Sequence, residues 1–237
     1  MGIERKSSGF YEWDADPSLE RSTGLGIESG RVPQCMTRYN EGAFGGLFGS
    51  PHFGFREQSL DFLSLAKRKP TWLWFWDVDL NNIDALYGFD ELDRFGINPN
   101  RPGIDFSRFR RLGVVVNHWL KQDTGIAQAP IRTYDLWHFK PRSKSFADLE
   151  IPLAVERLVL NWANPSSLAG LPVLSKLVEL QIHRCRNLAD LSALPHIAPN
   201  LRHLLATTSS RLVPNPGVLD HPTLETARID GKEWIAP

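Results

Sequence analysis

The chain has 237 residues and carries 27 Lys and Arg against 27 Asp and Glu, so its formal net charge is zero. Nucleic acids and anionic membranes attract proteins with a basic surplus, and we therefore expect neither as the main partner. Apolar residues make up 42% and charged residues 23%, which is typical of a folded globular protein and not of a disordered one. Two cysteines are too few for a disulfide framework or for a zinc site with four cysteines.

The sequence contains no apolar run of about eighteen residues, so we expect no helix that spans a membrane. The first residues are charged and show no apolar core of a secretory signal, so we expect none. Both observations favour a cytoplasmic protein.

A repeated apolar pattern organises most of the chain. Its clearest copy starts at Leu177 and reads L-x-x-L-x-L-x-x-C, and a second copy starts at Leu73 and ends on Asn81. If the fourth position of each copy is taken as the anchor, successive anchors lie 17 to 24 residues apart. The anchors are Phe53, Trp76, Phe95, Leu112, Tyr134, Leu158, Leu180, Leu204 and Ala227.

This pattern resembles that of bacterial leucine-rich-repeat proteins with short repeats of about 22–24 residues. The resemblance implies an α/β solenoid with a curved parallel β-sheet on its concave side and turns, 3₁₀ segments or short helices on its convex side. Apolar residues three apart, such as Ile83, Leu86 and Phe89, favour 3₁₀ turns. The residues assigned to structural positions of the repeat are Leu73, Val78, Asn81, Asn100, Leu112, Asn117, Leu158, Leu160, Leu177, Leu180, Ile182 and Cys185.

Members of the family that the pattern resembles place a stacked amide at the ninth repeat position. Asn81, Asn100 and Asn117 are assigned to it, and Cys185 takes the same place as a buried structural thiol. Residues 1–48 do not fit the period and are interpreted as an N-terminal capping region. Residues 49–237 then form the solenoid with its C-terminal cap, in a single domain overall.

The run TWLWFW allows two interpretations. If it is extended, Trp72, Trp74 and Trp76 share one strand face, and Leu73 and Phe75 share the other. The repeat register instead places Leu73, Trp76 and Val78 in the core, which requires the strand to begin near Phe75.

Side chains at and beside the outward strand positions form the predicted binding surface on the concave face. They are Asp77, Asp79, Asn98, Trp119, Asp135, Trp137, His138, Asn161, Trp162, Gln181, His183 and Arg184. Because Trp119, Trp137 and Trp162 fall on consecutive coils, we expect an aromatic patch of the kind found in protein interfaces. The alternative is that Trp119 and Trp162 tuck into the turns between coils.

Motifs for catalysis are absent: the sequence has no phosphate-binding glycine loop, no G-x-S-x-G and no H-E-x-x-H. His138 and His183 fall two coils apart, so a metal would need a third ligand. We therefore expect no metal, no cofactor and no catalytic residue. The pair Asp77 and Asp79 leaves one alternative open, an enzyme with its site at this pair or near the N-terminal region.

The resemblance implies a protein-binding module. We expect an intracellular binder or inhibitor of another protein that acts through the concave face. A narrower hypothesis is a bacterial immunity protein that neutralises a toxin.

Overall fold

The computed structural model describes residues 2–14, 23–97, 100–212 and 216–234. The chain divides into two compact units. The first unit comprises residues 1–104 and 108–112, and the second comprises residues 105–107 and 113–237.

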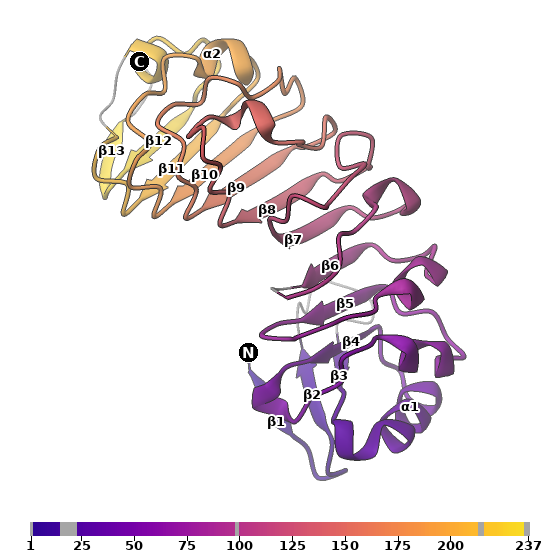
Figure 1. The fold of residues 1–237 in the computed structure, drawn as a ribbon. Coiled ribbons are helices and arrows are strands. Elements are labelled where there is room, and N and C mark those ends of the chain that lie inside the picture. The colour runs from indigo at the N-terminus through magenta and orange to yellow at the C-terminus, as the bar shows by residue number, and fades with distance from the viewer. Residues whose placement is uncertain (1, 15–22, 98–99, 213–215, 235–237) are drawn as a thin grey trace. The chain divides into compact units, whose positions relative to one another are not determined.

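Six strands lie in the described part of the first unit, and each pairs with the next along the chain (Figure 1). The first three strands pair antiparallel with one another, and the third to the sixth strands pair parallel. They are β1 (Ile3–Arg5), β2 (Tyr11–Asp14), β3 (Thr23–Gly26), β4 (Gly46–Gly49), β5 (Trp72–Phe75) and β6 (Arg94–Ile97). The connections contain the helix α1 (Val32–Glu41) and the 3₁₀ turns η1 (Ser29–Arg31), η2 (Pro51–Phe53), η3 (Asp61–Leu65) and η4 (Asp84–Gly88).

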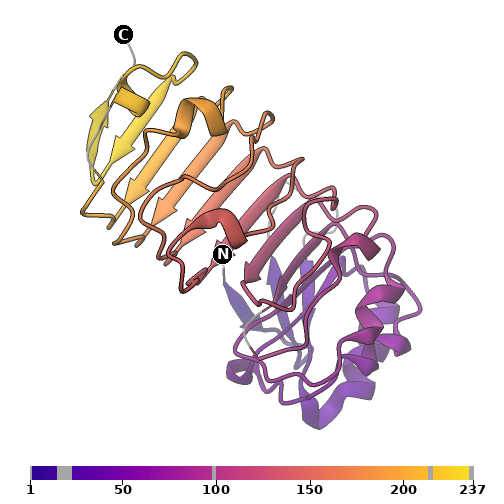
Figure 2. The ribbon, with the colours of Figure 1, turned by 45° about the horizontal axis from the view of Figure 1, so that its top comes forward.

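The second unit has the same plan with longer strands, which Figure 2 shows side by side in chain order. Its first six strands pair parallel, and the last described strand turns back antiparallel. They are β7 (Val114–His118), β8 (Thr133–Trp137), β9 (Arg157–Asn161), β10 (Glu179–His183), β11 (His203–Thr207), β12 (Thr226–Ile229) and β13 (Lys232–Trp234). The remaining short elements are η5 (Phe106–Arg108), η6 (Phe146–Asp148), α2 (Leu194–Ile197) and α3 (Pro216–Leu219).

The core of the second unit follows from the alternation of side chains along each strand. In β9, Leu158 and Leu160 point inward and are fully buried. Leu180 and Ile182 lie beside them in β10 and are also buried. Each coil buries its apolar edge against the next, so both units are open sheets with turns and short helices, an arrangement compatible with a solenoid.

The predicted register is confirmed from β8 onward. Tyr134 pairs with Leu158, Leu158 with Leu180, Leu180 with Leu204, and Leu204 with Ala227. The 3₁₀ turn predicted at Leu86 is also confirmed, because η4 contains this buried residue.

The register upstream of β8 was predicted wrongly in three coils, by three residues at Trp76 and Leu112 and by six residues at Phe53, whose place opposite Leu73 is taken by Leu47. Val115, and not Leu112, pairs with Tyr134. Leu73, and not Trp76, takes the anchor place in β5, where it pairs with Phe95. Leu112 and Val78 are buried, but both lie outside the strands. At β5 the repeat pattern gave the wrong register because Trp72 and Trp74 occupy outward positions and resemble core residues in the sequence. The extended interpretation of TWLWFW is therefore correct.

The predicted ladder of asparagines is also wrong. Asn81 and Asn100 are exposed. Asn117 lies inside β7 opposite Leu136 and donates from Nδ2 to Asp123 Oδ2 and to Tyr134 Oη, at 3.1 Å each. Cys185 is buried as predicted, and burial raises the pKa of its thiol to about 11.

Parallel pairing begins within residues 1–48, the segment predicted to be a cap. There β3 pairs with β4, and Leu25 and Leu47 extend the inward column upstream of Leu73. The antiparallel strands β1 and β2 precede this column.

Glycines in the first unit make room for tryptophan on the outward face of the sheet. The Trp72 ring lies across Gly24 and Gly46 of the two preceding strands, where any Cβ would overlap the indole. The Trp74 ring covers Gly96 of the following strand in the same way. Trp13 of β2 meets Trp72 edge-on at 5.6 Å, so aromatic rings cover this part of the sheet.

Gly46→Ala should destabilise the protein by about 1–3 kcal/mol, because the new methyl group overlaps the Trp72 ring in a packed site. Gly30→Ala is the matched control, since an added Cβ there meets nothing within 4 Å. The control should change the free energy of unfolding, measured in urea, by no more than about 0.5 kcal/mol. Equal effects of the two variants would contradict the glycine–tryptophan packing.

Candidate functional site

Five planar side chains stack on one another at the carboxyl ends of strands β7 to β10. We call them the aromatic ladder: His118, Trp137, His138, Trp162 and Arg184. The His118 and Trp137 rings stack at 5.4 Å with an interplanar angle of 13°, and Trp137 lies 5.0 Å from Trp162. His138 stacks on Trp162 at 5.4 Å, and the Arg184 guanidinium carbon lies 4.6 Å from the centre of the Trp162 ring.

The strand spacing explains the stacking distances. His118 and Trp137 occupy paired positions at the ends of β7 and β8, and adjacent strands lie about 4.8 Å apart. His138, Trp162 and Arg184 each follow the last residue of a strand and form a second column one residue further on. Planar groups on neighbouring coils are thus held near stacking distance by the backbone.

The residue that directly follows each of the strands β8 to β12 has a left-handed backbone, and we call these residues corners. The φ angles of His138, Trp162, Arg184 and Thr208 are 60°, 50°, 57° and 53°. Each of the first three corners is fixed by its backbone N–H, which donates to the last carbonyl of the next strand; Trp162 N lies 2.9 Å from His183 O, for example. A left-handed residue with a side chain costs about 1–2 kcal/mol, a cost that glycine avoids.

Hydrogen bonds also join polar side chains on the outward positions of the strands that precede the ladder residues. Asn161 Nδ2 donates to Asp135 Oδ1 at 2.5 Å. His183 binds Thr207 Oγ1 through Nδ1 at 2.7 Å and Gln181 Oε1 through Nε2 at 3.0 Å. These contacts span β8 to β11, so the outward side chains are fixed in place.

Burial perturbs the titration of this face. Burial raises the pKa of Asp135 to about 6, and three neighbours oppose that shift: the Trp137 indole, the Asn161 amide and the Arg157 charge. The indole N–H lies close enough to favour the ionised carboxyl, but it falls outside hydrogen-bond geometry. Burial lowers the pKa of His138, assisted by the charge of Lys140. The pKa of His183 is lowered by burial and by Arg157.

The structure brings eight of the predicted surface residues together on this face: Asp135, Trp137, His138, Asn161, Trp162, Gln181, His183 and Arg184. Trp119 is different, because it packs edge-on against Phe139 at 5.1 Å, as the alternative with tucked tryptophans predicted. Asn98 lies outside the described residues.

Asp77 and Asp79 were expected on the outward face of a strand, which is wrong. They follow the end of β5, and Asp77 has a left-handed backbone with φ 55°. Asp77 lies 3.8 Å from His52, with the two side chains 57% and 75% exposed. Such exposure is typical of a solvated surface pair and not of a catalytic dyad.

Sequence reasoning missed His118 as a ladder member. Its signal was present, because Val115 as anchor would have placed His118 in the same register position as Trp137. The aromatic cover on the first unit was also missed as a surface. There the Trp13, Trp74 and Trp76 rings are half-buried and gather with Phe53.

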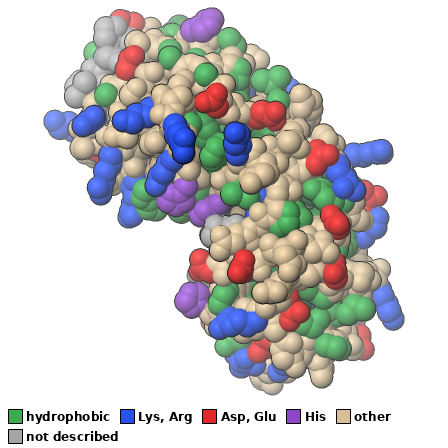
Figure 3. Space-filling model, viewed as in Figure 1, with side chains coloured by type: hydrophobic (Ala, Val, Ile, Leu, Met, Phe, Trp, Pro, Cys, Tyr) green, Lys and Arg blue, Asp and Glu red, His purple; other side chains and the backbone are tan. Residues whose placement is uncertain are grey.

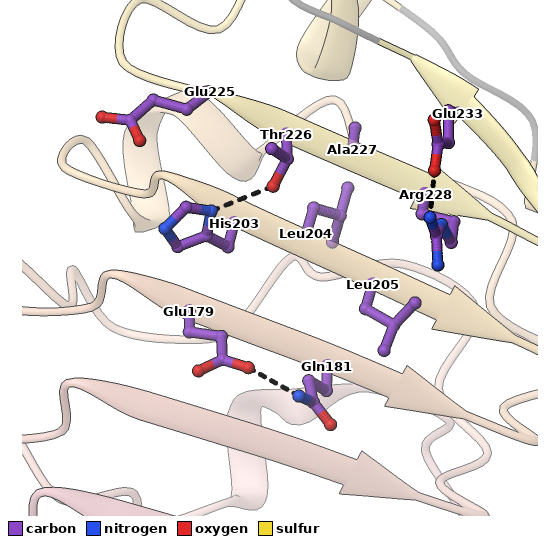
Figure 4. A pocket seen from close by; sticks show the side chains of 10 residues that line it. All are labelled: Glu179, Gln181, His203, Leu204, Leu205, Glu225, Thr226, Ala227, Arg228 and Glu233. Atoms are coloured by element: carbon purple, nitrogen blue, oxygen red, sulfur yellow. Dashed lines mark hydrogen bonds and ion pairs between the residues drawn. The ribbon is translucent and has the colours of Figure 1, made fainter.

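A pocket of about 460 Å³ opens on the outward face of β10 to β13 (Figure 4). Its charged side chains are already paired: His203 Nδ1 lies 2.9 Å from Thr226 Oγ1, and Arg228 pairs with Glu233. Gln181 Nε2 donates to Glu179 Oε1 at 2.5 Å. A ligand would have to displace these partners, so the pocket offers few free donors or acceptors.

Within the described ranges, no three His, Cys, Asp or Glu side chains are grouped so that they could hold a metal ion. No helix in those ranges has the length and apolarity needed to cross a membrane. Comparison of the chain with models of protein families, with curated proteins and with solved structures gives no match. The geometry of the side chains therefore carries the assignment of function.

Asp135 should titrate with a pKa of about 6, measured from the ¹³C shift of its carboxyl group. The folded protein then holds this proton more tightly than the unfolded chain, whose carboxyl keeps its ordinary pKa of 3.8. The contribution of Asp135 to the free energy of unfolding should therefore fall as pH rises from about 4 to about 6, by up to about 3 kcal/mol.

Asp135→Asn is the control for this titration, because an amide oxygen still accepts from Asn161 but carries no charge. The variant should gain stability relative to the natural protein as pH rises through the same window. A carboxyl that titrates near 4 in the folded protein would contradict the buried placement of Asp135.

Proposed function

We propose that this protein is a binding module that holds another protein against the outward face of its second unit, with the aromatic ladder at the centre of the contact. The coils, with one strand per turn and apolar residues in register, support placing the chain among leucine-rich-repeat proteins. In that family the outward strand face is the concave one.

The observation that carries the proposal is the choice of residues at the left-handed corners. Five consecutive corners, after strands β8 to β12, carry a residue other than glycine, and the first three of them carry the bulky His138, Trp162 and Arg184, although glycine would adopt the same backbone without strain. Bulky side chains in such positions persist when the surroundings hold them there, and they concentrate at functional sites. The strain supports a role for these side chains beyond the fold.

The chemistry of the ladder suits a protein interface. Trp and Arg are the residue types most enriched among interface positions that dominate binding energy. Arg184 is exposed and forms no ion pair with a described residue, so its charge is available to a partner. Stacking on Trp162 orients the guanidinium before binding, which reduces the entropy lost on association.

We favour a protein that inhibits the partner it binds. In this proposal it acts in the cytoplasm, as an immunity protein that neutralises a toxin. A protein that only binds needs a rigid surface and no catalytic groups, which agrees with the fixed polar contacts behind the ladder. The product of a neighbouring gene is the first partner to test, by co-purification and by inhibition of its activity. If that product neither binds nor loses activity, the immunity role is wrong.

Trp162→Gly should weaken binding of the identified partner by about 2 kcal/mol or more, because it removes the central ring of the ladder. Stability should change by no more than about 1 kcal/mol, since relief of the left-handed strain offsets lost stacking. Calorimetric titration measures the binding, and thermal unfolding measures the stability.

Thr208→Gly is the matched control for this variant. It relieves a corner of the same geometry, with φ 53°, but it removes no ring from the ladder. Binding should stay within about twofold of the natural protein, as is usual for a residue outside the dominant contacts. Equal loss of binding in both variants would show that the corners matter for shape and that the ladder does not bind.

A further inference from the structure

A basic pocket lies on the second unit, in the part of the chain that follows strands β7 and β8. It has a volume of about 510 Å³ and is lined by Trp119, Lys121, Lys140, Pro141, Arg142 and Asp148. Three of these six side chains are cationic and one is anionic, so the lining carries a formal charge of +2 (3 − 1). Figure 3 shows Lys and Arg side chains gathered on the second unit, with His side chains beside them.

The three cations have no acidic partner among the residues that the structure describes. None of Lys121, Lys140 and Arg142 forms an ion pair with a described residue. The one carboxylate in the lining, Asp148, accepts from Ser143 Oγ at 3.0 Å. This differs from the pocket on β10 to β13, where the charged groups already pair with one another. The three cations outnumber the single carboxylate of the lining, and an anionic ligand relieves the repulsion among them.

The aromatic wall of the pocket is fixed in place. Trp119 packs edge-on against Phe139 at 5.1 Å, and its backbone N–H donates to Trp137 O at 3.0 Å. Trp119 directly follows His118, and Lys140 comes two residues after His138, so the pocket adjoins the ladder through the same two coils.

We propose that this pocket binds carboxylate side chains of an acidic segment in the partner protein. The inference rests on the proposed function and names the chemistry of the partner. Lys121, Lys140 and Arg142 pair with Asp or Glu side chains, while Trp119 and Pro141 contact the apolar part of the same segment. Arg184, which forms no ion pair with a described residue, lies at the far end of the ladder and extends the cationic surface that such a segment meets.

Nucleic acid is the other class of negatively charged partner for this pocket, and the charge of the whole chain argues against it. The formal net charge is zero, whereas nucleic-acid binding depends on a basic surplus that releases counterions from many phosphates. A local group of cations beside apolar rings is the arrangement expected where charge complementarity selects a protein partner.

The test uses three probes at low ionic strength: hexaglutamate, hexalysine and hexathymidylate. The readout is the ¹H–¹⁵N resonance of the Trp119 indole, assigned with Trp119→Phe. Hexaglutamate should shift this resonance, hexalysine should leave it unchanged, and about 1 M NaCl should abolish the shift. Tighter binding of hexathymidylate than of hexaglutamate, or no shift with hexaglutamate, would overturn the proposal.

A triple variant locates the binding. Lys121→Gln, Lys140→Gln and Arg142→Gln together should weaken hexaglutamate about tenfold or more, since each exposed pair adds a modest share. The control replaces Arg132, Lys176 and Arg211 by Gln, which removes equal charge outside the pocket. Equal weakening in both variants would show a nonspecific charge effect and would overturn the proposal.

The test of the basic pocket can fail or succeed separately from the test of the aromatic ladder. Loss of partner binding in Trp162→Gly, together with an unshifted Trp119 resonance, would overturn the chemistry of the partner and leave the binding function standing. Binding of hexaglutamate without any effect of Trp162→Gly on the partner would overturn the ladder instead.

Discussion

The structure depends on the burial of apolar side chains between consecutive coils. No single coil covers its own leucines, so Leu158, Leu180 and Leu204 are buried only because each has a neighbour in register. The same register brings outward side chains to matching positions on neighbouring strands. The ladder is therefore a product of the core: rings stack near 5 Å because the inward leucines fix where each strand begins and ends.

The period and the inward positions from β8 onward could be predicted from the sequence because leucine and isoleucine recur there at constant spacing. Upstream, the same method failed at Trp76 and Leu112. The first unit covers the outward face of its sheet with aromatic rings over glycines, so apolar residues stand on both faces of β5 and the alternation no longer distinguishes inside from outside. A strand buried on both sides loses the pattern that identifies its register.

The candidate site was predictable in part. Trp137, Trp162 and Arg184 were assigned to the surface from their outward or neighbouring positions. The left-handed corners were not predictable, since no local signal marks a tryptophan with positive φ, and sequence preferences favour glycine or asparagine there. The separation of Trp119 from the ladder depends on its contact with Phe139, a packing detail between two coils that spacing alone does not determine.

The edge strands of the two units also have a consequence for solubility. An open parallel sheet ends in unpaired backbone groups that could template another chain. In the first unit β1 pairs antiparallel with β2, and in the second β13 pairs antiparallel with β12. These short strands carry Glu4, Arg5, Lys232 and Glu233. Charged side chains on these two strands oppose the pairing of a further strand with them.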